Sequence, residues 1–481
     1  MRDNRPMRIP TLLIALFAGL ATQAHAQLPA AVQEALRKAK LPEAAVSLWV
    51  APAESGKARW THNADQARNP ASVMKLLTSF AALDLLGPAY SWETTALLDG
   101  TLSDGTLKGN LILHGSGDPF LTWDRLGVFL RELRSRGLRR IDGDLVLDRS
   151  AYALEPADPA QFDGRSARAY NAAPDALMVN FNAITLRLAI DSAGAVVAQS
   201  TQPFASLVIR NKLKPATGEC GDWRNRAAAE LGVTGETVQV VLSGSYAASC
   251  GEKLLNLAVP DARAQTGGVF RALWAELGGE FNGRVREGNA PVDARRFASW
   301  QSPPLADILR DTDKYSNNVM ARQIFLALGQ AGSTSPAPQQ DALGAIARLQ
   351  GWMPGQGLDP QQWVLENGSG LSRKERTTAA QLGSLLLSAW RSPRMPEFAA
   401  ALPVIGVDGT MKRRLNASLV QGRGFVKTGT LDGVKSAAGY VLDAQGKWVA
   451  FAWLVNDAGA ERSDPALDAL IETLYSEEIA H

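Results

Sequence analysis

A serine and a lysine, Ser72 and Lys75, lie three residues apart in a stretch that is otherwise nearly all apolar. On a helix, side chains at this spacing share one face, so the lysine amine can reach the serine hydroxyl. A serine hydroxyl is a poor nucleophile until a base removes its proton. Lys75 can be that base if burial and a neighbouring cation such as Lys427 lower its pKa. The pair therefore predicts nucleophilic catalysis. The alternative, a solvated lysine beside a helix-start serine, leaves a lysine in an apolar stretch unexplained.

Two further polar motifs follow, Ser316–Asn318 (Ser-Asn-Asn) and Lys427–Gly429 (Lys-Thr-Gly). The first is predicted to lie in a loop before a helix, where its side chains could also act as a helix cap. The second is predicted to lie on a strand, where Gly429 leaves room for an extended peptide to pair along the edge. Lys427 and the Thr428 hydroxyl would then meet a terminal carboxylate. Alone, this lysine would be interpreted as an exposed strand residue, so the argument depends on the three motifs occurring together.

Histidine is too scarce to favour another kind of hydrolytic site. The chain has four histidines, and His25 falls in a predicted leader, which leaves His62, His114 and His481. None has the spacing of a paired zinc ligand, and a Ser-His-Asp triad would have to use His62 or His114. We expect a base other than histidine, and we expect no metal or other cofactor.

The N-terminal residues predict export. A basic start with three arginines precedes an apolar run, Thr11–Ala21, and a small-residue cleavage site, Ala24–Ala26. This is the layout of a secretory signal peptide, here residues 1–26. The apolar run is too short to span a bilayer core of roughly 30 Å, and no stable membrane anchor is expected elsewhere. The mature protein is predicted to be soluble in the periplasm.

The charge balance argues against a nucleic-acid partner. The whole chain carries a formal charge of +2, and the predicted leader, with three arginines and one aspartate, also carries +2. The mature protein is therefore close to neutral, whereas nucleic-acid binding requires a net basic face.

The two cysteines, Cys220 and Cys250, form an even pair in a predicted exported protein, which favours a disulfide. Closing a loop of about 30 residues would stabilise the fold by roughly 3–4 kcal/mol in the chain-entropy model. The alternative is two buried free thiols.

The pattern of apolar residues predicts helices packed against an antiparallel sheet, an α/β (α+β) sandwich with one long insertion. Helices are expected over Pro29–Lys40, from Pro70 to Leu86 and over Ala466–Tyr475, and strands over Ala44–Val50, Ala58–His62, Gly424–Thr430, Lys435–Leu442 and Lys447–Val455. Inside the insertion, Leu126–Leu145 and Gly268–Val285 both have a helix–Gly–strand pattern. They could share one domain, with the cysteine-bearing stretch between them, or they could simply repeat a common α/β pattern.

With these motifs together, the chain resembles the type-4 (class C) low-molecular-mass penicillin-binding proteins, a family of serine D-alanyl-D-alanine carboxypeptidases and endopeptidases. The similarity covers essentially the whole mature chain. Besides the three motifs it includes Gly115–Pro119, Arg140–Asp144, Asn180–Asn182, Gly368–Arg373 and Leu402–Thr410. One departure is Asn367, where the family often has Asp before Gly-Ser-Gly, and it affects a neighbouring contact rather than the mechanism.

The resemblance implies a penicillin-binding/serine β-lactamase-like transpeptidase sandwich with two extra domains between the S-x-x-K and S-x-N motifs. The catalytic domain would comprise residues 27–92 and 290–481, and the inserted region residues 93–289. Within that region, segments of about 93–182 and 258–289 would form one domain, and about 183–257 a nested domain.

The resemblance also implies catalytic roles. Ser72 would form the acyl-enzyme with Lys75 as its general base, and Ser316 would relay a proton to the leaving D-alanine nitrogen. The backbone N–H groups of Ser72 and Thr430 would form the oxyanion hole.

Substrate-binding roles follow in the same way. Asn318 would hydrogen-bond the substrate backbone, and Lys427 and Thr428 would hold its terminal carboxylate.

The expected function is a D-alanyl-D-alanine carboxypeptidase and endopeptidase that acts on peptidoglycan peptides and cross-links and is covalently acylated by β-lactams. A serine β-lactamase or related esterase is one alternative, and a binding protein with an idle site is another. Class A β-lactamases carry a deacylating Glu followed four residues later by Asn. Between the second and third motifs, Glu366, Glu375 and Glu397 all lack that asparagine. A penicilloyl ester on Ser72 is therefore expected to persist.

Overall fold

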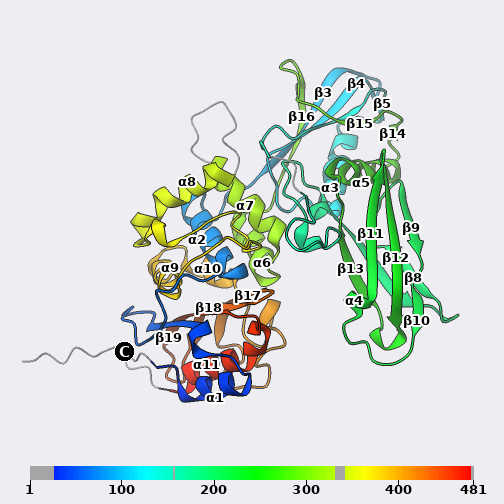
Figure 1. Ribbon diagram of the computed structural model, residues 1–481. Coiled ribbons are helices and arrows are strands. Elements are labelled where there is room, and N and C mark those ends of the chain that lie inside the picture. Colours follow the sequence, from blue (N-terminus) through cyan, green and yellow to red (C-terminus); the bar gives the residue numbers. More distant parts are fainter. Residues whose placement is uncertain (1–26, 155–157, 331–341, 478–481) are drawn as a thin grey trace, which may run out of the picture.

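The computed structural model describes residues 27–154, 158–330 and 342–477. The predicted signal peptide, residues 1–26, lies outside the described residues. Within the described ranges, no helix is both long and apolar enough to cross a bilayer. Figure 1 shows two parts, a helix-and-sheet domain on the left and a region rich in long strands on the right.

A five-stranded antiparallel sheet is the centre of the first part. Its order is β17-β18-β19-β1-β2, so strands from both ends of the chain lie side by side. The strands are β1 (Val46–Pro52), β2 (Trp60–His62), β17 (Gly424–Leu431), β18 (Val434–Leu442) and β19 (Trp448–Asn456). The predicted C-terminal strands and the mixed helix-and-sheet fold are confirmed.

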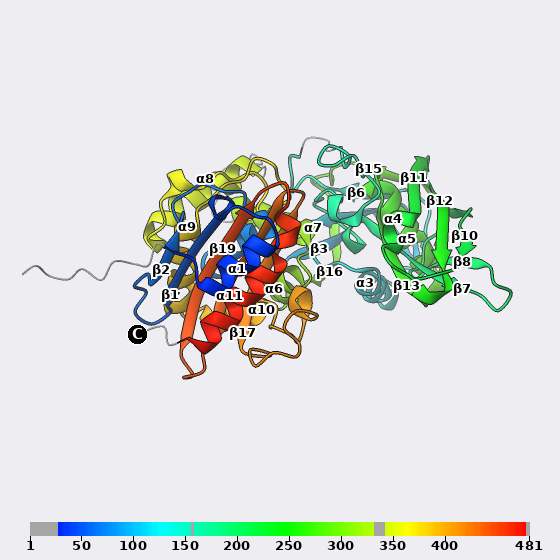
Figure 2. The ribbon, with the colours of Figure 1, turned by 60° about the horizontal axis from the view of Figure 1, so that its bottom comes forward.

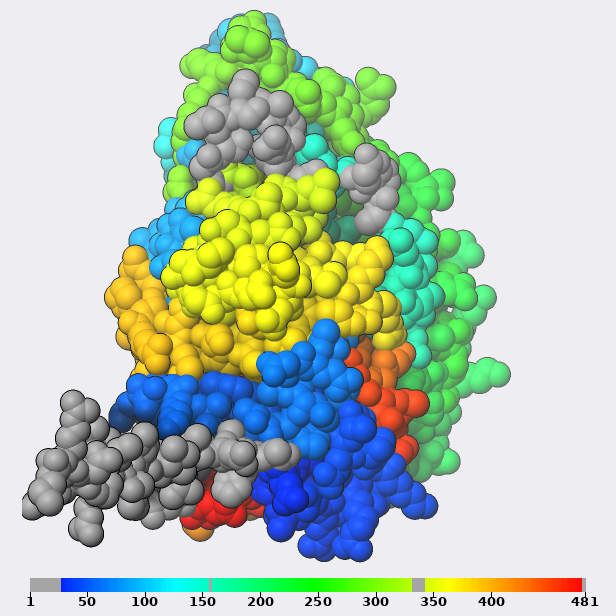
Figure 3. All heavy atoms as spheres, turned by 60° about the vertical axis from the view of Figure 1, so that its left-hand side comes forward, coloured from blue at the N-terminus to red at the C-terminus, as the bar shows by residue number. Residues whose placement is uncertain are grey.

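Helices cover both faces of this sheet. On one face lie α1 (Ala30–Lys38) and α11 (Asp464–Ser476), which Figure 2 shows in front of the strands. The other face carries a larger helical layer, whose yellow part lies above the blue N-terminal residues in Figure 3. Its helices are α2 (Lys75–Leu85), α6 (Leu305–Lys314), α7 (Asn318–Gln330), α8 (Ala342–Trp352), α9 (Ala379–Arg391) and α10 (Met395–Ala401). Because both faces are covered, β18 and β19 are buried along almost their whole length.

The sequence pattern predicted one continuous α-helix for the segment that carries Ser72 and Lys75. The structure shows two elements instead. Ala71–Met74 form a 3₁₀ turn, and α2 begins at Lys75. Asn69 Oδ1 accepts a hydrogen bond from the Ala71 N–H at 2.8 Å, which satisfies a donor at the start of the turn. In 3₁₀ geometry, side chains three residues apart are eclipsed. The two side chains therefore share a face, but for a different local reason.

A second sheet is formed by strands from the two ends of the inserted region. Its order is β14-β5-β4-β3-β16, with β6 pairing with both β4 and β15. The strands are β3 (Glu93–Ser103), β4 (Thr106–Gly115), β5 (Arg140–Ile141), β6 (Leu145–Asp148), β14 (Glu280–Phe281), β15 (Val285–Glu287) and β16 (Arg295–Gln301). They share a core with α3 (Trp123–Ser135) and α5 (Ala262–Glu276). β5 pairs with β14 and β6 with β15, both in parallel. The two helix–Gly–strand segments therefore lie in one sheet.

The position of strand β16 bears on where the expected insertion ends. It pairs antiparallel with β3, with Gln301 opposite Glu93. The sequence analysis assigned residues from 290 onward to the catalytic domain. Because this pairing makes β16 part of the second sheet, we propose that the inserted region extends to about residue 301. The strand gave no local signal of its partner, which lies some 200 residues earlier in the chain.

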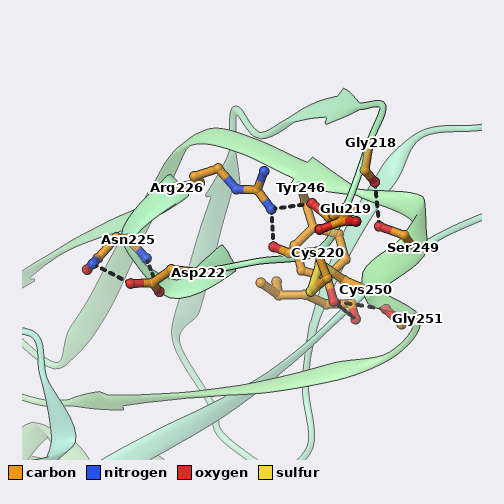
Figure 4. Close-up of a disulfide and its surroundings, with 11 residues drawn as sticks. Gly218, Glu219, Cys220, Asp222, Asn225, Arg226, Tyr246, Ser249, Cys250 and Gly251 are labelled. Carbon is orange, nitrogen blue, oxygen red and sulfur yellow. Dashed lines mark hydrogen bonds between the residues drawn. A yellow bond between two sulfur atoms is a disulfide. The ribbon is translucent and has the colours of Figure 1, made fainter. Parts of the chain in front are cut away.

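The innermost part of the insertion is built from two smaller sheets, β13-β7-β8 and β10-β12-β11 with β9 beside β12. The elements are β7 (Ala183–Ile190), β8 (Val196–Ser200), β9 (Leu207–Asn211), β10 (Lys214–Ala216), α4 (Trp223–Arg226), β11 (Ala227–Thr234), β12 (Thr237–Ala247) and β13 (Lys253–Ala258). Cys220 and Cys250 form a disulfide here, which confirms the predicted pairing. Arg226 donates to the Cys220 carbonyl, and Ser249 Oγ donates to the Gly218 carbonyl at 2.6 Å (Figure 4).

Candidate active site

The amine of Lys75 joins the first two motifs. Its Nζ donates hydrogen bonds to Ser72 Oγ at 3.2 Å, to Asn318 Oδ1 at 2.7 Å and to the Ser369 carbonyl oxygen at 2.5 Å. The side chain is fully buried, at 0% exposure. Burial, and then the charge of Lys427, hold the Lys75 pKa well below its ordinary value. An amine with a lowered pKa gives up its own proton more readily, and it can then accept one from the serine.

A second lysine joins the remaining motifs. Lys427 Nζ donates to Ser316 Oγ at 2.8 Å and to the Thr428 carbonyl oxygen at 2.8 Å. Lys427 is also fully buried, and burial lowers its pKa to about 8 while the charge of Asp313 acts in the opposite direction. Lys427 is therefore mostly cationic at neutral pH. Ser316 has a φ of 55° in the turn between α6 and α7, a left-handed conformation that few non-glycine residues adopt.

The edge of β17 is open only along its second half. The first half is covered by residues 403–405, where the Val426 N–H donates to the Pro403 carbonyl at 2.8 Å. Backbone groups alternate between the two sides of a strand, so those of Thr428 and Thr430 face the same side as Val426. Thr430 is exposed, and Thr428 Oγ1 donates to Thr410 Oγ1 at 2.8 Å. An extended peptide could pair with this uncovered edge.

Gly429 allows β17 to lie directly against the turn that carries Ser72. A Cβ at Gly429 would be 2.3 Å from Ser436 Oγ, 2.8 Å from the Ser72 nitrogen and 2.9 Å from the Pro70 oxygen. The sequence analysis explained this glycine by the room it leaves for a peptide. The structure shows another requirement, the close approach of two backbone segments inside the protein.

A buried carboxylate holds the Gly368–Arg373 segment in place. Glu375 Oε1 accepts hydrogen bonds from three consecutive backbone N–H groups, those of residues 366, 367 and 368, at 3.0–3.2 Å. This arrangement positions the Ser369 carbonyl that accepts from Lys75. Asn367 contributes as well, because its Oδ1 accepts from Ser369 N and Oγ and its Nδ2 donates to the Leu371 carbonyl. Asn367 therefore makes a full set of local contacts.

The inserted region reaches the rim of the site. Asn318 Nδ2 donates to the carbonyl oxygen of Tyr170 at 3.2 Å, from the 3₁₀ turn Ala169–Asn171. The Arg373 guanidinium lies over the ring of Phe162, 4.8 Å from its centroid. Sequence reasoning missed Tyr170, because no motif marks a residue that acts through its backbone.

The structure brings all seven residues predicted for the site to one region. Lys75 contacts both Ser72 and Asn318, Lys427 contacts Ser316, and Thr428 and Thr430 follow Lys427 along β17. Glu375, Ser369 and Thr410 were not predicted, although the last two lie in segments that carried the family resemblance. Among the described residues, no group of three or more His, Cys, Asp or Glu side chains could hold a metal ion. The arrangement can support acyl transfer through a serine ester.

Comparisons with known proteins agree over nearly the whole chain. The model of the D-Ala-D-Ala carboxypeptidase 3 (S13) family matches residues 28–475. The chain is 29% identical over 391 residues to D-alanyl-D-alanine carboxypeptidase DacB of Haemophilus influenzae, covering 80% of both chains. The crystal structure of penicillin binding protein 4 from the same organism superimposes with a TM-score of 0.74 at 24% identity, covering 92% of this chain and 99% of that one. A second structure of that protein, complexed with a β-lactam, has a TM-score of 0.72 at 25% identity and covers 93% and 99%.

Proposed function

The chain belongs to the D-Ala-D-Ala carboxypeptidase 3 (S13) family, and we propose that Ser72 is the nucleophile of this serine carboxypeptidase and Lys75 its general base. The observation that carries the proposal is the position of the Lys75 amine, buried and 3.2 Å from Ser72 Oγ. A base must lie within hydrogen-bond reach of the proton that it removes and must be able to lose its own. Lys75 meets both requirements.

The proposed reaction proceeds on a peptide that pairs along the open edge of β17. Lys427 and Thr428 hold its terminal carboxylate, and Asn318 hydrogen-bonds its backbone. Ser72 Oγ attacks the carbonyl of the D-Ala–D-Ala bond as Lys75 takes the hydroxyl proton, and the N–H groups of Ser72 and Thr430 stabilise the oxyanion. The proton that Lys75 has taken passes through the Ser316 hydroxyl to the departing D-alanine amine as the C–N bond breaks, which leaves Lys75 neutral again. Water then hydrolyses the ester.

Cross-link cleavage follows from the same acyl-enzyme, and we propose it as a second activity. A cross-link is an amide of the same D-alanyl carbonyl with a different amine as its leaving group, so Ser72 can attack it in the same way. Digestion of purified cross-linked peptidoglycan, followed by product analysis, tests this proposal. Release of free D-alanine together with separated stem peptides is expected. Release of D-alanine with all cross-links intact would restrict the enzyme to carboxypeptidase activity.

β-Lactams should acylate Ser72, since they present a reactive amide beside a carboxylate. Among the glutamates of the segment between the second and third motifs, Glu375 is fully buried with one oxygen bound to three N–H groups, and Glu366 is bound to Ser372 and Lys374. Neither of these two is free to activate a water molecule, and Glu397 is followed four residues later by Ala401 rather than Asn, so the ester should last.

Intact mass spectrometry after mixing with benzylpenicillin tests both points. We expect a one-to-one adduct lasting minutes or longer in the unmodified enzyme and no adduct in folded Ser72→Ala. Rapid loss of the antibiotic without an adduct would indicate a β-lactamase, and a retained adduct in Ser72→Ala would exclude this nucleophile.

We propose that the enzyme works in the periplasm on peptidoglycan after removal of residues 1–26. The support is the sequence pattern of that segment together with the cell-wall substrate class of the family. N-terminal sequencing of the exported protein should begin at Gln27. A mature chain that retains the apolar run would refute cleavage.

A further inference from the structure

A buried carboxylate, that of Asp313, acts electrostatically on both lysines, and the proposed reaction does not use it. It is the penultimate residue of α6 and has 0% exposure. Its Oδ2 accepts a hydrogen bond from Ser79 Oγ at 2.7 Å, while its Oδ1 is buried without a hydrogen-bond partner. Ser79 follows Lys75 by one turn of α2, so Asp313 meets the same side of that helix as the lysine.

Hydrogen bonds through Ser316 also link Asp313 to the second lysine. The Asp313 carbonyl oxygen accepts from the Ser316 N–H at 3.3 Å, and Ser316 Oγ accepts from Lys427 Nζ at 2.8 Å. A buried carboxylate oxygen without a hydrogen bond is costly unless nearby cations compensate it. Burial raises the Asp313 pKa to about 6, and the charges of Lys427 and then Lys75 oppose that rise. Asp313 is therefore an anion above about pH 6.

Among the described residues, the ionisable groups buried around the site are three basic and two acidic ones. They are those of Lys75, Lys427 and Arg322 and those of Asp313 and Glu375. Glu375 acts on both Arg322 and Lys75, and Asp313 acts on both lysines, whereas the charge of Arg322 lowers the pKa of Lys75. Lys314, the next residue to Asp313, is bound to Asp408 and to the Leu402 carbonyl. Two anions therefore face three basic groups, and Lys75 is the one whose charged form the neighbouring cations Lys427 and Arg322 disfavour.

We propose that Asp313 is a positioning residue that acts as the shared counter-charge of the lysine pair. With this one anion the pair keeps one ammonium group, that of Lys427, for the substrate carboxylate, while Lys75 serves as the neutral base. The inference rests on the proposed roles of the two lysines. A single anion in a poorly solvated site stabilises one ammonium group, not two. Without that anion, both lysines would hold their protons less tightly.

The test is the pH dependence of kcat/KM for a peptide ending in D-Ala-D-Ala, compared between the unmodified enzyme and Asp313→Asn. Loss of the anion should move both limbs of the profile to lower pH, each by about one unit. The ratio of activity at pH 8 to that at pH 6 should then fall about tenfold. Asp118→Asn is the matched control, because Asp118 is also buried, with a pKa raised to about 6 and one unpartnered oxygen, but lies in the inserted region. The Asp118→Asn variant should show both limbs of the kcat/KM profile at the same pH as the unmodified enzyme.

A lower kcat/KM with an unshifted profile would mean a purely structural role and would overturn the proposal. If Asp313→Asn does not fold, NMR titration of ¹³C-lysine-labelled enzyme supplies the answer. The signals of Lys75 and Lys427, assigned by their loss in Lys75→Met and Lys427→Met, should each show a step near pH 6 as Asp313 ionises. Absence of that step overturns the proposal too. This titration needs no turnover, so it distinguishes failure here from failure of the proposed function.

Discussion

The two buried lysines of the site can take different roles because their surroundings differ. Lys75 donates only to neutral oxygens, those of Ser72, Asn318 and Ser369. Lys427 donates to Ser316 and to its own strand. The charge of Asp313 acts on both lysines, whereas those of Lys427 and Arg322 lower the pKa of Lys75. Burial lowers the pKa of both groups, and the nearby charges separate them. Such a separation lets one group act as a base while the other remains a cation.

Recognition of the substrate carboxylate should fail in alkaline solution. The folded-state pKa of Lys427 is lowered to about 8, so the cation is present below that pH and is lost as the pH rises through it. We expect kcat/KM for free-acid peptides to fall over this range, and kcat/KM for amidated peptides to change less. Lys427→Ala should lower the free-acid value by about 10- to 100-fold, in line with loss of a charged hydrogen bond.

Lys435→Ala on the neighbouring strand β18 is the control for Lys427→Ala, since Lys435 is paired with Asp464 at 3.2 Å. It should leave both peptides unaffected. If free-acid and amidated peptides react equally well with the unmodified enzyme, the carboxylate role of Lys427 is wrong.

Four elements meet at the site, and each is held by backbone contacts that no motif describes. The 3₁₀ turn before α2 places the side chains of Ser72 and Lys75 on one face. The turn between α6 and α7 holds Ser316 in a left-handed conformation. Glu375 fastens the Gly-Ser-Gly segment, and β17 lies against the Ser72 backbone. The site is therefore sensitive to changes in backbone packing as well as to loss of side chains.

Gly429→Ala tests this packing. The added Cβ would lie 2.3 Å from Ser436 Oγ and 2.8 Å from the Ser72 nitrogen, so β17 must move away from the nucleophile. We expect acylation by benzylpenicillin to slow by at least about tenfold, because a displacement of the oxyanion-hole strand by about 1 Å is costly. Gly232→Ala on β11 is the matched control, since its Cβ would meet no atom within 4 Å. An equal effect of both substitutions on acylation would contradict this account.

At the scale of the whole molecule, the five-stranded sheet is assembled from both ends of the chain, and β3 and β16 lie side by side where the proposed insertion begins and ends. The insertion is also part of the site, because the Tyr170 carbonyl binds Asn318. Its innermost sheets, with the disulfide, lie on the far side of the molecule from the helical layer in Figure 1. Stability and catalysis should therefore be separable there.

Removal of the disulfide should test this separation. A Cys220→Ser/Cys250→Ser double variant should lose roughly 3 kcal/mol of stability in the inserted region, the chain-entropy value for a loop of this length. Hydrogen exchange should show faster opening of β11 and β12, whereas kcat/KM should remain unchanged. A proportional loss of activity would instead couple the nested sheets to the site.

The sequence by itself determined the parts of this protein that have a local signature. The alternating and continuous apolar patterns predicted β17, β18 and β19, and the odd placement of Lys75 in an apolar run predicted a reactive pair. The joint occurrence of three motifs, and the family resemblance that they carry, predicted Ser72, Ser316 and Lys427 as members of one site. These predictions were possible because strand periodicity, turn residues and helix spacing act over a few residues.

Only the tertiary structure decided which charges face one another. Asp313 and Glu375 belong to no motif, and their importance arises from burial beside lysines that lie up to about 300 residues away in the chain. The same holds for β16, whose partner strand lies some 200 residues earlier, and for the need for glycine at position 429. Desolvation, charge pairing and close backbone approach depend on packing between distant segments, and such packing leaves no periodic trace in the sequence.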